Sequence, residues 1–255
     1  SVLFVPPLAE EMNKCRPMLA MTARLLAARG VQAIAVDLLG TGDSAGEFRG
    51  ARLDDWRQDL DLVADWAVRE GAPVTGIVGM RFAALLALEL AASLPGPLRI
   101  ALWQPVASGQ LQLTQFLRLR VAGSLLTGGA ATGPAAESVA SLAAELKAGK
   151  VFEVGGYELQ PGLAADLQDP DLRQLAPPAG AAVRWFEVSA GEAPALLAGG
   201  EGGSLIAWTR PTATSLAAAL EEVWTAGHQE FADESTAGSV EVVADAGHYI
   251  QDDDP

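Results

Sequence analysis

An abrupt change from a strand pattern to a helix pattern constrains the fold of this chain more than any other feature. Residues 74–78 form a short apolar run of the kind found in buried strands, and an Ala/Leu-rich helical pattern follows over residues 82–94. Gly79 and Ala83 stand two residues before and two after the midpoint, Arg81. Small residues at both places let a strand and a helix nearly touch, so we predict a tight strand-to-helix elbow with Arg81 at its apex.

Strand and helix patterns alternate along most of the chain. The strands are nearly continuous apolar runs, which is typical of a parallel sheet covered by helices on both faces. The sequence therefore predicts an α/β fold with a mostly parallel, doubly wound sheet. Strands are expected at 2–5, 31–36, 74–78, 98–103, 183–188 and 240–243, and helices at 12–28, 53–67, 82–94 and 215–224.

The alternation stops between residues 107 and 178. This span has helical patterns at 111–126 and 135–147 but no clear buried strand. We interpret it as a helical cap or lid inserted over the ends of the strands. Residues 1–106 and 179–255 then form the core.

The apex residue limits the chemistry that the elbow can perform. A nucleophile elbow carries Ser, Cys or Asp at this place, whereas Arg81 offers only hydrogen-bond donors and stays protonated. Cys15 and Ser44 are the alternative nucleophiles. Cys15 lies near the start of a helix, where a thiolate is favoured, but its place on the apolar stripe also fits a buried, inert cysteine.

Two runs near the N-terminus carry a family resemblance. They are Val-Pro-Pro-Leu-Ala-Glu-Glu-Met-Asn-Lys at residues 5–14 and Asp-Leu-Leu-Gly-Thr-Gly-Asp-Ser at residues 37–44. With the elbow, they resemble the α/β-hydrolase superfamily and, more narrowly, the second type of exosortase A system-associated hydrolase. The resemblance implies an α/β-hydrolase fold and a role beside bacterial exopolysaccharide production and protein sorting. It also implies that arginine at the elbow apex is a family trait.

A histidine and a carboxylate follow the elbow in the chain order of these hydrolases. His248 comes directly after the last expected strand and is the candidate general base. Glu187, at the end of the strand expected at 183–188, is the first choice for the acid that orients it. Glu192 and Asp245 are alternatives. We expect His248 to lie within hydrogen-bonding reach of one of these carboxylates.

An oxyanion hole in this fold uses two backbone N–H groups. One would come from Phe82, directly after the apex, and the other from Leu8 or Ala9 in the loop after the first strand. The same place could bind an anion, because Arg81 stands at a helix N-terminus.

The charge of Arg81 needs a partner if the side chain is shielded from water. An internal carboxylate would make Arg81 structural, and Glu10, Glu11 and Glu187 are the candidates. An external carboxylate or phosphate would instead make it a ligand-binding residue. The internal partner is favoured, because Glu10 and Glu11 lie on the neighbouring loop.

Composition excludes several classes of partner. Asp and Glu outnumber Lys and Arg by 32 to 17, which gives a net charge of −15 and argues against nucleic-acid binding. One cysteine and two histidines leave no disulfide and little material for a metal site. No apolar run reaches the length of a membrane span and no signal peptide is visible, so we expect a cytoplasmic protein. The glycine loop at 40–46 has the wrong spacing for a dinucleotide and opens no helix, so no cofactor is expected.

Three functions remain open from the sequence. The first is a hydrolase of a small ester, thioester or amide. The second is a catalytically inactive hydrolase-fold protein that binds a carboxylate- or phosphate-bearing ligand. The third is a partner-docking protein that uses the cap. The sequence identifies neither the substrate nor the oligomeric state.

Overall fold

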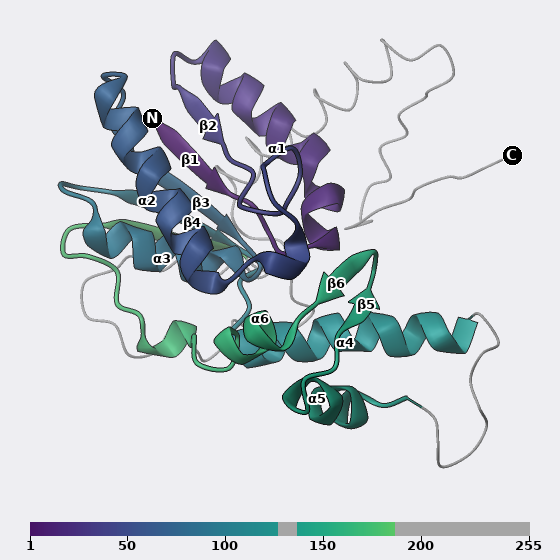
Figure 1. Cartoon of the computed structure of the whole chain (residues 1–255). Helices are drawn as coiled ribbons and strands as arrows, with labels where there is room; N and C mark the ends of the chain where they lie inside the picture. The colour runs from purple at the N-terminus through teal and green to yellow at the C-terminus, as the bar shows by residue number, and fades with distance from the viewer. Residues whose placement is uncertain (127–136, 187–255) are drawn as a thin grey trace, which may run out of the picture. The chain divides into compact units, whose positions relative to one another are not determined.

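A parallel sheet of five strands forms the centre of the computed structural model, which describes residues 1–126 and 137–186 (Figure 1). The strand order is β2-β1-β3-β4-β7, and every neighbouring pair is parallel. This confirms the α/β class and the doubly wound sheet. The expected strand at 240–243 lies outside the described residues. The five strands are β1 (Val2–Val5), β2 (Ala33–Ala35), β3 (Gly76–Met80), β4 (Arg99–Trp103) and β7 (Ala182–Phe186).

Among the described residues, three helices cover this sheet, namely α1 (Glu10–Ala28), α2 (Leu53–Arg69) and α3 (Ala83–Ser93). Right-handed crossovers in this strand order put α1 on one face and both α2 and α3 on the other, as Figure 1 shows. Helix α3 is buried on nearly all sides. Its many alanines allow this, because they let the helix lie close to β3. A short 3₁₀ turn, η1 (Phe48–Gly50), precedes α2.

Between β4 and β7 the chain leaves the sheet. The inserted elements are α4 (Gly109–Leu126), α5 (Val139–Lys147), β5 (Phe152–Val154), β6 (Tyr157–Leu159), α6 (Pro161–Asp166) and the 3₁₀ turn η2 (Leu172–Gln174). None of the described strands in this insertion joins the main sheet.

The insertion contains a β-hairpin, so the expectation that it holds no buried strand is wrong. Strands β5 and β6 pair antiparallel, and Val154 and Leu159 are both buried. Gly155 and Gly156 join the strands with φ of 57° and 87°. Positive φ at both positions is what a two-residue hairpin turn of type I′ requires, and glycine adopts it without strain.

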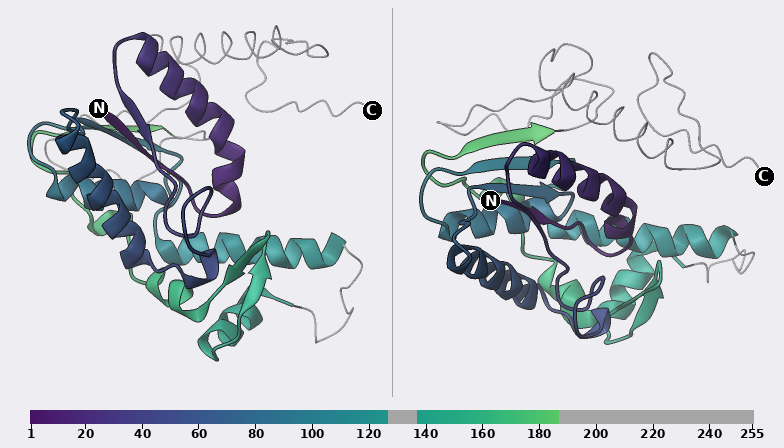
Figure 2. Two further views of the ribbon diagram at one scale, coloured as in Figure 1. Left: turned by 45° about the horizontal axis from the view of Figure 1, so that its top comes forward. Right: turned by 90° about the horizontal axis from the view of Figure 1, so that it is seen from above.

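The insertion lies across the carboxyl ends of the strands in two views (Figures 1 and 2). Arg52, just before α2, forms a bidentate ion pair with Asp166 of α6 at 2.6 and 2.7 Å. Asn13 of α1 donates a hydrogen bond to the hydroxyl of Tyr157 in β6 at 3.1 Å. These contacts hold the insertion against the core. Its description as a separate cap stays a prediction.

No helix in the described ranges is both long and apolar enough to cross a membrane.

Candidate functional site

The elbow lies where the sequence predicts it, with β3 ending at Met80 and α3 beginning at Ala83. Arg81 occupies the apex with φ of 56°, a left-handed conformation that is uncommon for a residue with a side chain. A Cβ atom added to Gly79 would lie 2.7 Å from the backbone oxygen of Ala83. This close approach explains why a glycine stands at residue 79.

The guanidinium of Arg81 is held by three partners inside the protein. Nε donates to Oε1 of Glu11 at 2.9 Å, one terminal nitrogen donates to the backbone oxygen of Gln104 at 3.2 Å, and the other donates to Oε1 of Gln115 at 2.7 Å. The side chains of Arg81 and Glu11 are only 29% and 20% exposed. Glu11 is therefore the internal carboxylate that partners Arg81.

Residues with a strained backbone conformation lie around this ion pair. Within the described ranges, the only residues other than glycine with positive φ are Ala9, Arg81 and Gln104, at 54°, 56° and 46°. They follow β1, β3 and β4, which are neighbours in the sheet. Strained backbone of this kind persists only where the surroundings enforce it, and it concentrates at functional sites.

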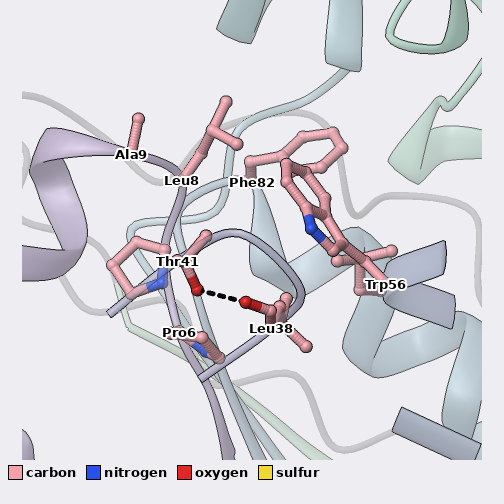
Figure 3. A pocket seen from close by; sticks show the side chains of 9 residues that line it. Pro6, Leu8, Ala9, Leu38, Thr41, Trp56 and Phe82 are labelled. Carbon is pink, nitrogen blue, oxygen red and sulfur yellow. Dashed lines mark hydrogen bonds between the residues drawn. The ribbon is translucent and has the colours of Figure 1, made fainter. Parts of the chain in front are cut away.

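All three candidate oxyanion-hole residues, Leu8, Ala9 and Phe82, line one small cavity (Figure 3). Leu8 and Phe82 face it together with Trp56 and Thr41, whose hydroxyl donates to the backbone oxygen of Leu38 at 2.7 Å. Among the described residues, the backbone N–H groups of Leu8 and Phe82 have no acceptor. The cavity volume is about 10 Å³, which is room for about one water molecule.

The alternative nucleophiles differ in their surroundings. Cys15 is half-buried on α1, and burial, followed by the charge of Glu11, raises the pKa of its thiol. A raised pKa keeps Cys15 in the thiol form, which is the weaker nucleophile. Ser44 is half-buried in the loop after β2, and its N–H donates to the backbone oxygen of Thr41 at 3.0 Å. In the described part of the chain, neither side chain donates a hydrogen bond to a base.

The expected acid and base of the site fall on residues that the structure does not describe. Glu187, Glu192, Asp245 and His248 all lie outside the described ranges, so their contacts stay predictions. Within those ranges, no group of three or more His, Cys, Asp and Glu side chains could hold a metal ion.

Sequence reasoning missed the amides around Arg81. Gln104 follows β4, while Gln112 and Gln115 project from α4 three residues apart, on one face of the helix. Gln112 is 2% exposed, and its Nε2 donates to Oε2 of Glu11 at 3.3 Å. The signal in the sequence was a pair of glutamines at helical spacing between apolar residues.

One protein-family model matches residues 5–255 of the chain; it describes the alpha/beta hydrolase family. No curated protein matches the chain at a significant level.

Several solved structures resemble part of the chain. A protein from Agrobacterium vitis S4 assigned as a hydrolase is 17% identical over 73% of this chain and 67% of its own, with a TM-score of 0.46. Est1E from Butyrivibrio proteoclasticus, solved with ferulic acid bound, is 16% identical over 73% and 68%, with a TM-score of 0.46. Alpha/beta hydrolase domain-containing protein 10 from mouse is 18% identical over 73% and 68%, with a TM-score of 0.43. Likeness at this level says nothing about activity.

Proposed function

The chain belongs to the alpha/beta hydrolase family, and from this premise we propose that it hydrolyses a small ester, thioester or amide at the elbow. One observation carries the proposal. The three strained residues Ala9, Arg81 and Gln104 converge at the carboxyl ends of neighbouring strands. Ligands of parallel α/β sheets bind at these ends.

The backbone N–H groups of Phe82 and Leu8 would bind the carbonyl oxygen of the substrate. Both residues face the same small cavity, and neither N–H has an acceptor among the described residues. Donors fixed in place by the backbone stabilise the negative charge that develops on this oxygen, because they need no reorganisation during the reaction.

Water is the nucleophile in this proposal, because Arg81 stays protonated and is paired with Glu11. The imidazole of His248 takes a proton from the water as its oxygen attacks the carbonyl carbon. The tetrahedral intermediate then collapses, and the leaving alcohol, thiol or amine receives that proton from His248. Glu187 would orient the imidazole, with Glu192 and Asp245 as alternatives.

An acyl-enzyme on Cys15 or Ser44 is the competing route. The raised pKa of Cys15 weakens it as a nucleophile, and the hydroxyl of Ser44 donates no hydrogen bond to a base in the described ranges. We therefore consider water a better candidate for the nucleophile than either Cys15 or Ser44.

The narrower family membership is part of the same proposal. The run at residues 5–14 supports a relation to the second type of exosortase A system-associated hydrolase, since it supplies Leu8, Ala9 and Glu11 to the site. We expect a small-molecule substrate and no nucleic-acid partner.

The test is hydrolysis of p-nitrophenyl butyrate and a butyryl thioester by the purified chain. We expect slow steady-state turnover without an initial burst, because no acyl-enzyme accumulates when water attacks directly. His248→Ala should reduce turnover by about 10²- to 10⁴-fold, the usual contribution of a general base. Turnover that persists unchanged in His248→Ala, or no turnover of either probe, would contradict the proposal.

Anion binding without turnover is the second candidate, and the donors of Arg81 favour it. Three of its five N–H groups have acceptors in the described part of the chain, so two could bind a carboxylate or phosphate. Glu11 already balances the charge, which makes this candidate the weaker one. It predicts that the chain binds acetate or inorganic phosphate, and that Arg81→Ala removes the binding.

A further inference from the structure

Thr41 contributes a hydroxyl group to the lining of the small cavity beside the elbow. Nine residues line this cavity, and Thr41 and Trp56 are the two among them whose side chains carry a polar atom (Figure 3). The indole N–H of Trp56 donates to the backbone oxygen of Leu39 at 3.0 Å, so this donor is already used. The hydroxyl of Thr41 is different, because its hydrogen can rotate about the C–O bond to another acceptor.

The hydrogen bond that the Thr41 hydroxyl now makes is not needed by its acceptor. The hydroxyl donates to the backbone oxygen of Leu38 at 2.7 Å, and the backbone N–H of Thr41 donates to the same oxygen at 2.9 Å. If the hydroxyl turns to another acceptor, the oxygen of Leu38 keeps the N–H as its donor. Turning therefore leaves no buried polar group unpaired, which would otherwise cost free energy.

The loop that carries Thr41 is held in place by its neighbours. Gly40 and Gly42 flank Thr41 with φ of 73° and 52°, and a Cβ atom on Gly42 would collide with the carboxylate of Asp37. The backbone N–H of Asp43 donates to this carboxylate at 2.9 Å. A donor that the loop fixes in this way can stabilise a developing charge without reorganisation of the backbone.

The cavity fits one oxygen atom of a ligand. Its volume is about 10 Å³, the room that one water molecule needs, and it is open on part of its boundary, so the burial of its walls does not close it. Leu8 and Phe82 line the same cavity as Thr41, and their backbone N–H groups have no acceptor among the described residues. An oxygen atom that enters the cavity therefore meets two backbone donors and one hydroxyl in its walls.

We infer that the hydroxyl of Thr41 is a third donor to the carbonyl oxygen of the substrate. In the free protein the hydroxyl donates to Leu38; as the tetrahedral intermediate forms, it turns and donates to the oxyanion beside the two backbone N–H groups. No covalent bond of Thr41 forms or breaks, and its proton stays on the hydroxyl. The inference rests on the proposed function, because it assigns a further catalytic residue to the same reaction.

The first test is the hydrolysis of p-nitrophenyl butyrate by three variants. Thr41→Val removes the hydroxyl and keeps the shape, and we expect kcat to fall by about 10- to 100-fold with KM unchanged, because the hydrogen bond is made only in the transition state. Thr41→Ser keeps the hydroxyl and should retain kcat to within about threefold. Thr22→Val is the matched control, since the hydroxyl of Thr22 on α1 also donates to a backbone oxygen, that of Met18, at 2.9 Å. A Thr41→Val variant with the same kcat as Thr22→Val would overturn the inference.

A thionoester separates a catalytic role of Thr41 from a structural one. In O-(p-nitrophenyl) thionobutyrate, sulfur replaces the carbonyl oxygen, and sulfur accepts hydrogen bonds only weakly. Loss of a donor to this atom should slow the ester more than the thionoester, so the ratio of the two rates should fall by about tenfold in Thr41→Val. A structural role slows both substrates alike. An unchanged ratio would therefore contradict the inference.

Binding of a charged tetrahedral analogue tests the inference without turnover. Methyl butylphosphonate carries a negatively charged oxygen on a tetrahedral phosphorus, as the intermediate does on a tetrahedral carbon. Calorimetric titration should show its affinity falling by about tenfold in Thr41→Val and staying at the wild-type value in Thr22→Val. Equal affinity for the two variants would overturn the inference. Circular dichroism checks the folding of each variant.

These tests separate the inference from the proposed function. A chain that binds the phosphonate through Thr41 but hydrolyses no ester would retain the hydroxyl as an oxyanion donor and lose the hydrolase. A chain that hydrolyses the ester as fast in Thr41→Val as in the wild type would do the reverse.

Discussion

Arg81 combines a strained backbone with a charge that is partly shielded from water. Its φ is 56°, and its guanidinium is bound by Glu11, Gln104 and Gln115. A side chain held by partners from α1, from the end of β4 and from α4 can enforce a backbone conformation that is otherwise unfavourable. The residue that replaces the nucleophile therefore fixes the loops around the elbow in place.

Removing Arg81 should destabilise the chain. Arg81→Ala leaves the carboxylate of Glu11 partly buried without its cation, and we expect a loss of about 2 kcal/mol in the free energy of unfolding. The measurement is urea unfolding of the wild type, Arg81→Ala, Glu11→Gln and the double variant. The cycle should give a coupling energy of about 1–2 kcal/mol. A coupling near zero would mean that the ion pair does not stabilise the fold.

At the elbow, β3 and α3 pack closely against each other. Gly79→Ala would place a Cβ atom 2.7 Å from the backbone oxygen of Ala83 and from the Cβ of Ala87. Neither neighbour is the end of a flexible side chain, so β3 and α3 have to move apart. We expect a loss of about 1–3 kcal/mol, measured by thermal unfolding.

The control for this prediction is Gly123→Ala in α4. A Cβ atom there meets nothing within 4 Å. Because alanine favours helix more than glycine does, this variant should gain about 0.5–1 kcal/mol. A Gly79→Ala variant as stable as the wild type would show that β3 and α3 can separate without cost.

Asp166 of α6 connects the insertion to the start of α2. Its carboxylate binds Arg52 and accepts a hydrogen bond from the backbone N–H of Leu53 at 3.1 Å. The hydrogen bond from Arg52 lowers the pKa of Asp166 below its ordinary value of 3.8. A carboxylate with a lowered pKa stabilises the fold above its ordinary pKa, and the contribution is lost as the pH falls through the folded-state value.

We therefore expect Asp166→Asn to be less stable than the wild type at pH 6, by about 0.5–1 kcal/mol. The difference should disappear as the pH falls from about 4 towards 2, because the wild-type carboxyl group becomes protonated in the same range. Urea unfolding of both proteins at several pH values measures it. A difference that does not change with pH would mean that the charge of Asp166 contributes nothing.

Sequence patterns predicted the strands and the elbow because burial and backbone geometry are local. Gly79 and the apolar run at residues 74–78 specify the turn without knowledge of the rest of the chain. The β5–β6 hairpin was missed, although Gly155 and Gly156 are a strong turn signal, because its strands are only three residues long.

The residues around Arg81 also include one that the sequence predicted, Glu11, and others that it did not. Glu11 was among the candidates because it is close to the elbow through the loop after β1. Gln112 and Gln115 reach Glu11 and Arg81 only after the insertion folds back over the strands. Such a contact depends on tertiary structure, and the helical spacing of the two glutamines does not by itself identify their partners.

At the scale of the whole molecule, acidic residues dominate the charge. The chain carries 32 acidic and 17 basic residues, a net charge of −15. Most of the ion pairs among the described residues include at least one side chain that is more than a third exposed, and such pairs contribute little to stability. Salt screens both the repulsion between like charges and the attraction within these ion pairs. Because the exposed pairs contribute little, weakening the repulsion should be the larger effect and should stabilise the fold.

We expect the melting temperature to rise with salt at pH 7, by about 2–5 °C between 20 and 300 mM NaCl, since screening shortens the Debye length from roughly 20 Å to about 6 Å. Thermal unfolding followed by circular dichroism measures the rise. Magnesium chloride at matched ionic strength is the control, because general screening depends on ionic strength whereas a specific cation site would respond to the ion. A melting temperature that falls with NaCl would show that the ion pairs, including Arg81–Glu11, stabilise the chain more than its net charge destabilises it.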